Sequence, residues 1–198
     1  MNRLIPSAFV FAALSASSIA GEISSAYSDL DTGKDCTIFA AAEEGDGEWA
    51  NLVCSGLRGY PVFLYAGDLR ETLFYGFPPA GDMAPAWESF SAFNAAGAKI
   101  EWRLETSSGR AIPFATIHRR KVSNSVESDS STEVLVVSKV GQPHARDGCV
   151  VGLVLASGNP DANRQAREVA DAKARGFACG ADQPVSVGEP MPDFRRDN

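Results

Sequence analysis

Residues 149–179, CVVGLVLASGNPDANRQAREVADAKARGFAC, decide the fold that the sequence predicts. The first eight of them, 149–156, are almost wholly apolar, which is typical of a central strand covered on both faces. Asn159 then offers a helix cap, and Pro160 suits the first helical position. A helix is therefore expected over residues 159–177, directly after this strand.

Apolar and charged residues are expected on opposite faces of this helix. The apolar stripe is made mostly of small side chains, which lets the helix lie close against a sheet. Gly176 and Cys179 are expected to end the helix and hold it in place. The stripe consists of Ala162, Ala166, Val169, Ala170, Ala174 and Phe177, and the opposite face mostly of Arg164, Arg167, Glu168, Asp171 and Arg175.

The chain before this stretch predicts strands joined by turns. Residues 100–104 alternate apolar and charged side chains, which indicates a strand with one solvated face. Trp87, Phe90 and Phe93 have helical spacing and predict a short helix. Strands are expected at residues 36–42, 49–54, 61–66, 69–77, 100–104, 111–122, 132–140 and 149–156, with Gly67-Asp68 as the turn of the second hairpin and 123–131 as a long polar connection.

The predicted fold class is α+β. A mainly antiparallel sheet of about seven strands carries a C-terminal helix on one face. No internal repeat or linker divides the chain, so residues 21–180 are expected to form a single domain. Residues 181–198 have little apolar pattern and are expected to be a flexible tail.

Residues 1–20 have the features of a secretory signal peptide. Met1-Asn2-Arg3 gives a basic start, residues 4–14 form an apolar stretch, and Ser18-Ile19-Ala20 supplies small residues before the cleavage point. The apolar stretch is shorter than a membrane span, and Gly21 gives no cysteine for a lipid. The mature chain is expected to be soluble, without a membrane span, and periplasmic or secreted.

Composition narrows the classes of partner. The 198 residues carry a net charge of -7, and 44% are hydrophobic, which excludes a disordered chain. Nucleic acids and anionic membranes attract cationic surfaces, so an acidic chain is not expected to bind them. Basic partners remain allowed. Walker A and dinucleotide glycine motifs are absent from the sequence, so no cofactor is expected.

Four cysteines in an exported chain predict two disulfides. Three connectivities are possible. We favour Cys36 with Cys54, which brackets a hairpin, and Cys149 with Cys179, which ties a strand to the end of the following helix. Zinc is disfavoured, because no cysteine has another cysteine or a histidine within four positions.

Candidate catalytic groups are few. A Ser-His-Asp hydrolase needs a histidine beside an activated serine, and the only histidines are His118 and His144. No Gly-x-Ser-x-Gly elbow is present. His118 precedes Arg119-Arg120-Lys121 and is expected at a solvated strand end, while His144 lies in the loop 141–148. No catalytic residue is therefore assigned.

Two other groups are weak candidates for a binding site. Asp29, Asp31 and Asp35 resemble the opening of a calcium loop, but Gly33, Lys34 and Ala40 stand where further ligands and the turn glycine belong. Several aromatic residues are candidates for a ligand groove, with core packing as the favoured role. These aromatic residues are Trp49, Trp87, Trp102, Phe74 and Tyr75.

A set of short phrases runs through residues 29–183. They are DLD at 29–31 before Cys36, EWRL at 101–104, PFATI at 113–117, Cys149, and NPDAN at 159–163 leading to ARE at 166–168 and Cys179. In these phrases the chain resembles a group of small exported proteins of alphaproteobacteria that have no assigned activity. The resemblance implies a periplasmic address and transfers no site residue.

Together these features favour a non-catalytic binding domain that acts on a partner in the cell envelope. The acidic charge makes a basic protein, such as a lysozyme, the concrete expectation, and the domain would then act as its inhibitor or ligand. The alternatives are an envelope hydrolase that uses His118 or His144, and a structural protein stabilised by calcium at Asp29, Asp31 and Asp35.

Overall fold

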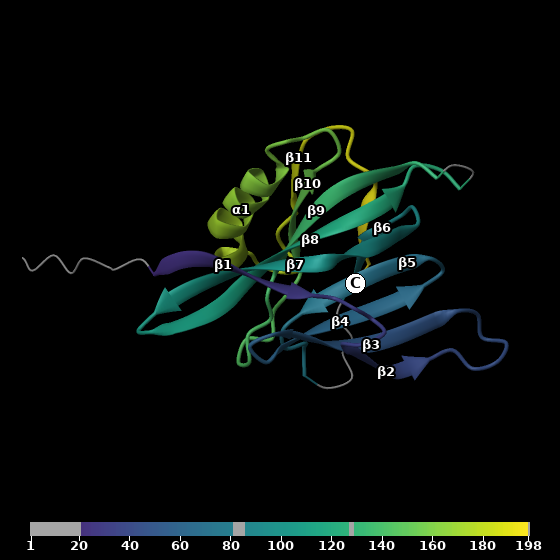
Figure 1. Cartoon of the computed structure of the whole chain (residues 1–198), viewed down its shortest axis with the longest axis horizontal. Coiled ribbons are helices and arrows are strands. Elements are labelled where there is room, and N and C mark those ends of the chain that lie inside the picture. The colour runs from purple at the N-terminus through teal and green to yellow at the C-terminus, as the bar shows by residue number, and fades with distance from the viewer. Residues whose placement is uncertain (1–20, 81–85, 127–128, 198) are drawn as a thin grey trace, which may run out of the picture.

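The computed structural model describes residues 21–80, 86–126 and 129–197, so the predicted signal peptide lies outside it. These residues form twelve strands, one α-helix and one 3₁₀ turn (Figure 1). The elements are β1 Glu22–Asp29, β2 Cys36–Ala41, β3 Trp49–Leu57, β4 Tyr60–Gly67, β5 Arg70–Tyr75, β6 Trp87–Phe90, β7 Asn94–Ser107, β8 Arg110–Ser123, β9 Ser131–Lys139, β10 Val150–Leu155, α1 Ala162–Lys173, η1 Ala174–Gly176, β11 Val185–Val187 and β12 Phe194–Asp197.

The strands form three sheets, and the expected single sheet of about seven strands is wrong. Six strands follow the order β1-β7-β8-β9-β10-β11, four follow β2-β3-β4-β5, and β12 pairs with β6. Neighbouring strands are antiparallel except β10 and β11, which are parallel. The alternation of side chains along a strand does not tell which strands share a sheet, because that depends on contacts distant in sequence.

Helix α1 packs on one face of the six-stranded sheet (Figure 1). Ala162, Ala166 and Ala170 are buried against the sheet, as the apolar stripe predicts. The helix packs so closely on β10 that a Cβ at Gly152 would lie 2.6 Å from Cγ1 of the Val169 side chain. The helix begins three residues later than expected, because Asn159 uses its side chain to accept a hydrogen bond from the Asp161 amide at 3.1 Å.

The other face of the six-stranded sheet is covered as well. Ile100 and Trp102 of β7 pack against the inner face of the four-stranded sheet, where Val62 and Leu64 are buried. The β6–β12 ribbon covers β9 and β10, with Phe90 and its neighbours forming a third apolar cluster. The apolar run at 149–156 is therefore covered on both faces, as predicted.

Two predictions about segments that pack on the six-stranded sheet are corrected. Residues 87–90 form strand β6 and no helix, because β12 pairs with them and places Phe194 opposite Phe90. The ring centroids of these two residues are 5.2 Å apart. The segment 181–197, expected to be a flexible tail, contains β11 and β12, whose apolar residues pack on the sheet.

Both predicted disulfides are confirmed. Cys36–Cys54 joins neighbouring positions of β2 and β3, and Cys149–Cys179 joins the start of β10 to the segment that follows η1. Residues 149–179 are thus closed into a loop that contains both β10, which lies next to the edge strand β11, and the helix. Among the described residues, no helix combines the length and the apolar character that crossing a membrane requires.

Candidate binding cleft

A large open cleft lies where the ends of several strands meet. It has a volume of about 1520 Å³, which exceeds the roughly 300–1,000 Å³ of typical small-molecule sites. A cleft of this size accommodates a peptide or a protein loop. Its walls are the β2–β3 connection with Trp49, the β4–β5 turn with Arg70 and Glu71, Trp87 of β6, Phe93 to Ala95 at the start of β7, Lys121 and Ser123 of β8, and 129–131 at the start of β9.

Apolar side chains are exposed along the rim. Trp49 is 40% exposed and Leu69 is 69% exposed, and Trp87 and Phe93 are half-buried in the wall. Exposed large apolar groups that gather around one concavity are typical of an interaction site. The sequence identified Trp49 and Trp87 as candidates, but missed Leu69 and Phe93.

The turn that carries Leu69 is strained. Asp68 and Leu69 form it, one residue later than the predicted Gly67-Asp68, and both have positive φ, 49° and 56°. For a bulky residue such as Leu this conformation costs about 1–2 kcal/mol. Arg70 fixes the turn, because it pairs with Asp68, donates to the Ser91 carbonyl at 2.8 Å and stacks on Phe93. The turn therefore presents an apolar side chain at the rim.

The cleft is acidic. Its lining contains five carboxylates, Asp46, Glu48, Asp68, Glu71 and Asp129, and two cations, Arg70 and Lys121. Asp68 is paired with Arg70. Within the part of the chain that the structure describes, Asp46, Glu48 and Asp129 form no ion pair, and all three are exposed. The cleft therefore offers unneutralised negative charge beside apolar surface.

The floor of the cleft rests on a buried arginine. Arg120 was expected on a solvated basic strand end, but it is 5% exposed. It donates to the Glu71 carbonyl at 2.7 Å and to Asn94, and its pKa is lowered by burial. Glu71 also accepts a hydrogen bond from the Ala96 amide at 2.7 Å. These bonds tie β5, β7 and β8 together beneath the cleft.

His118 is also buried, which corrects its predicted place at a solvated strand end. Its Nε2–H donates to the Gly97 carbonyl at 2.6 Å, and its Nδ1 accepts from the Tyr75 hydroxyl at 2.8 Å. Burial lowers the pKa of His118 to about 4, so the ring is neutral at pH 7. A catalytic base must reach the proton that it takes, and this ring has both nitrogens occupied inside the core.

The remaining predicted candidates lie apart from the cleft. His144 is exposed in the loop after β9, and its ring forms no hydrogen bond with a described residue. Asp29 pairs with Lys99 at 2.6 Å and Asp31 pairs with Lys34 at 3.0 Å, while Asp35 caps the Asp31 amide. Within residues 21–80, 86–126 and 129–197, no three side chains of His, Cys, Asp or Glu gather as a metal site.

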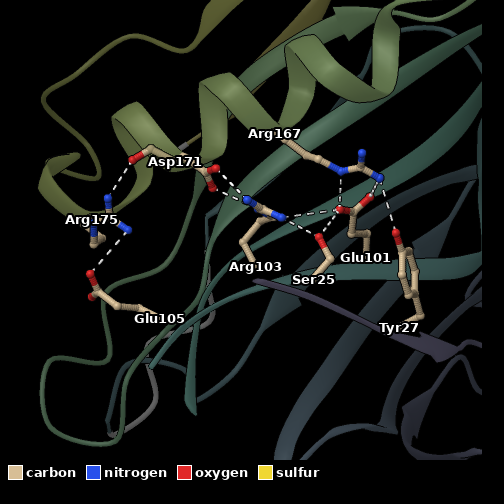
Figure 2. Close-up of polar contacts among 8 residues, drawn as sticks. All are labelled: Ser25, Tyr27, Glu101, Arg103, Glu105, Arg167, Asp171 and Arg175. Carbon is tan, nitrogen blue, oxygen red and sulfur yellow. Dashed lines mark hydrogen bonds and ion pairs between the residues drawn. The ribbon is translucent and has the colours of Figure 1, made fainter. Parts of the chain in front are cut away.

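A second group of charged residues lies between α1 and β7 (Figure 2). The strand that was expected to have one solvated face has both faces covered, and Glu101 and Arg103 are only 7% and 8% exposed. Arg167 holds both oxygens of Glu101 at 2.6 and 3.1 Å, and Arg103 holds both oxygens of Asp171 at 2.9 and 2.6 Å.

Other residues complete this group. Ser25 of β1 bonds to both Glu101 and Arg103, and Arg175 reaches Glu105 at 3.8 Å (Figure 2). Hydrogen bonds to Glu101 raise the pKa of Arg167 above its ordinary value. Every carboxylate in the group is therefore neutralised by an arginine, and the group joins the helix to the sheet.

Comparison with known proteins gives no family for this chain: no family model, curated protein or solved structure matches it.

Proposed function

We propose that the protein is a periplasmic or secreted binding domain whose cleft holds a basic segment of a cell-envelope protein. The observation that carries this proposal is the exposed Trp49 and Leu69 beside unpaired Asp46, Glu48 and Asp129. Aromatic anchors supply most of the binding energy at protein interfaces, and complementary charge speeds association and selects the partner. A lysozyme is the concrete form of such a partner.

Three features support this assignment. Two disulfides are compatible with an oxidising compartment outside the cytoplasm. The cleft exceeds the volume that a small ligand needs. The strained turn at Leu69 has no packing role in the core, since its side chain is 69% exposed, and strain of this kind is concentrated at functional sites.

The first experiment identifies the partner. Oxidised residues 21–198 are immobilised and exposed to a periplasmic and envelope extract, and separately to a lysozyme, at low and at moderate salt. We expect a basic protein to be retained in stoichiometric amount and released as the salt concentration rises, because screening weakens exposed charge pairs. If only neutral or acidic proteins are retained, the proposal fails.

The second experiment locates the site by variants, with affinity measured by titration calorimetry. Trp49→Ala and Leu69→Ala should each weaken binding about tenfold or more. The double variant Asp46→Asn with Glu48→Gln should make the binding affinity less dependent on salt concentration. The matched control, Glu22→Gln with Glu189→Gln, removes the same charge from exposed positions outside the cleft. Equal losses in the control and the cleft variants would show that only net charge matters, and would refute the site.

A further inference from the structure

Among the described residues, β2 is an edge strand that carries no charged residue and no proline against pairing. In the four-stranded sheet β5 is shielded, because Thr72 bonds to the backbone of Glu88 in β6 at 2.8 Å. At the opposite edge, β2 pairs with β3 on one side, and no other described strand lies on its second side. β2 therefore presents an open row of backbone donors and acceptors.

The sequence of β2 lacks the residues that normally block an edge. Cys36–Ala41 reads CTIFAA, without charge, proline or glycine. Ile38 and Phe39 are 59% and 52% exposed. The other edge strands differ: β1 reads EISSAYSD, β12 reads FRRD and β11 has three residues. Charged residues, short length and bulges protect an edge from pairing; β2 has only a bulge, at Phe39, which leaves Cys36–Ile38 as its regular open edge.

The backbone geometry shows which groups are open. The Ser55 amide donates to the Asp35 carbonyl at 2.8 Å, so the backbone of Asp35 points toward β3. Backbone groups alternate along a strand, and those of Cys36 and Ile38 therefore point outward. A bulge follows at Phe39. The ring centroid of Phe39 lies 6.3 Å from that of Phe63 and 6.2 Å from that of Tyr65, and both pairs meet edge to face on the same sheet. The open edge thus lies beside an exposed aromatic cluster.

The charged residues beside β2 indicate which kind of segment the edge binds. Four carboxylates follow β2, at Glu43, Glu44, Asp46 and Glu48, and they form no ion pair within the described part of the chain. Asp35 stands just before β2. A second copy of the chain would bring carboxylates against carboxylates, because antiparallel pairing sets Asp35 of one copy near Glu43 and Glu44 of the other. A segment with Lys or Arg beside its strand would instead be attracted.

We propose that β2 is a docking edge that binds an extended segment of a partner protein by strand addition. The segment is apolar at its centre and carries Lys or Arg at its ends. Its backbone pairs with Cys36 and Ile38, its side chains contact Phe39, and its cations face the carboxylates that flank the strand. Main-chain hydrogen bonds then give affinity, and side chains give selectivity. The proposal does not depend on the apolar rim of the cleft, although Asp46 and Glu48 belong both to the cleft and to the flank of β2.

The test uses a synthetic peptide in which alternating Thr and Val residues stand between two Lys residues at each end. Its binding to oxidised residues 21–198 is followed by fluorescence polarisation, and amide exchange is followed by NMR. We expect saturable binding and at least tenfold slower exchange of the Cys36 and Ile38 amides. A peptide of the same charge with N-methyl groups on alternate residues cannot pair as a strand, and it should bind at least tenfold more weakly.

Variants of the edge complete the test. Ile38→Pro removes an outward donor, and Ile38→Lys adds a repelling charge, so each should weaken binding at least tenfold. Val126→Lys, which makes the same change at an exposed residue outside β2, should alter it less than twofold. Equal binding of the N-methylated peptide, or protection in the cleft instead of in β2, overturns the proposal. So does a dimer in sedimentation that Ile38→Lys dissolves, because a second copy would then occupy the edge.

The edge proposal and the cleft proposal can each be refuted without the other. Trp49→Ala reports on the cleft alone, and Ile38→Pro reports on the edge alone.

Discussion

At the scale of single residues, His118 shows how burial changes chemistry. Ile117 faces the helix-side core, and His118 faces Tyr75 in the core below the four-stranded sheet. Because β8 is covered on both faces around His118, this polar residue is buried. The neighbouring basic residues predicted a solvated strand end. This prediction was wrong because the local sequence does not show which elements pack on the strand.

The buried histidine predicts a pH dependence of stability. Its pKa is lowered to about 4 in the folded chain, against about 6.5 in the unfolded chain. Between these values the unfolded chain binds more protons, so the free energy of unfolding falls as the pH is lowered from 6.5 to 4. The loss attributable to His118 is about 3 kcal/mol, and urea unfolding at intervals of pH measures it.

The variant His118→Gln is the control for this prediction. It cannot gain the proton, so its stability should change less than that of the natural chain between pH 6.5 and 4. Its stability at pH 7 should be lower, because the bonds to Gly97 and Tyr75 are altered. If both proteins lose the same free energy over this interval, the histidine is not the source of the dependence.

At the scale of elements, the contact between α1 and β7 combines small apolar residues with two bidentate ion pairs. The apolar stripe of α1 was predicted, but Arg167 and Asp171 were expected to face solvent. They reach the sheet because the alanines keep the helix close, which brings the longer side chains at its flank over Glu101 and Arg103.

We predict that Asp171→Asn lowers the free energy of unfolding by about 2–3 kcal/mol. It removes the bidentate partner of Arg103, which is nearly buried and keeps only the more distant carboxylate of Glu101 at 3.9 Å, and a poorly compensated buried charge is costly. Equilibrium urea unfolding at pH 7 measures the change.

The matched control is Glu168→Gln on the same helix. Glu168 pairs with Arg164 at 2.7 Å, but both side chains are more than half exposed. Such pairs contribute about 0.5 kcal/mol or less. Similar losses in the two variants would show that the contact with β7 adds nothing beyond a surface pair.

At the scale of the whole molecule, the two disulfides cross-link two different parts of the fold. One lies in the four-stranded sheet, and the other encloses β10 and the helix. In the chain-entropy model, replacing Cys36 and Cys54 by Ala should cost about 3 kcal/mol, and replacing Cys149 and Cys179 should cost about 4 kcal/mol. Urea unfolding of the two double variants tests both values. An unchanged midpoint for either would show that its disulfide does not stabilise the fold.

Only some residues of the cleft could be found from sequence. Trp49 and Trp87 were candidates because they are aromatic. Trp102, Phe74 and Tyr75 are aromatic as well, but they lie in the core. Leu69 carries no sequence signal, because its exposure follows from its position in the β4–β5 turn and not from its residue type. The cleft itself is formed by strand ends far apart in sequence.

The sequence by itself favoured the disulfide pairs that form, and it predicted the C-terminal helix, the strand β10 that is covered on both faces, and most other strand segments. These features follow from residue spacing, propensity and periodicity, which act over a few residues. Only the tertiary structure decided how the strands divide among three sheets, that residues 181–197 join them, and that His118, Arg120 and Glu101 are buried. The physical reason is that burial depends on which element covers a face, and that element is set by packing between distant segments.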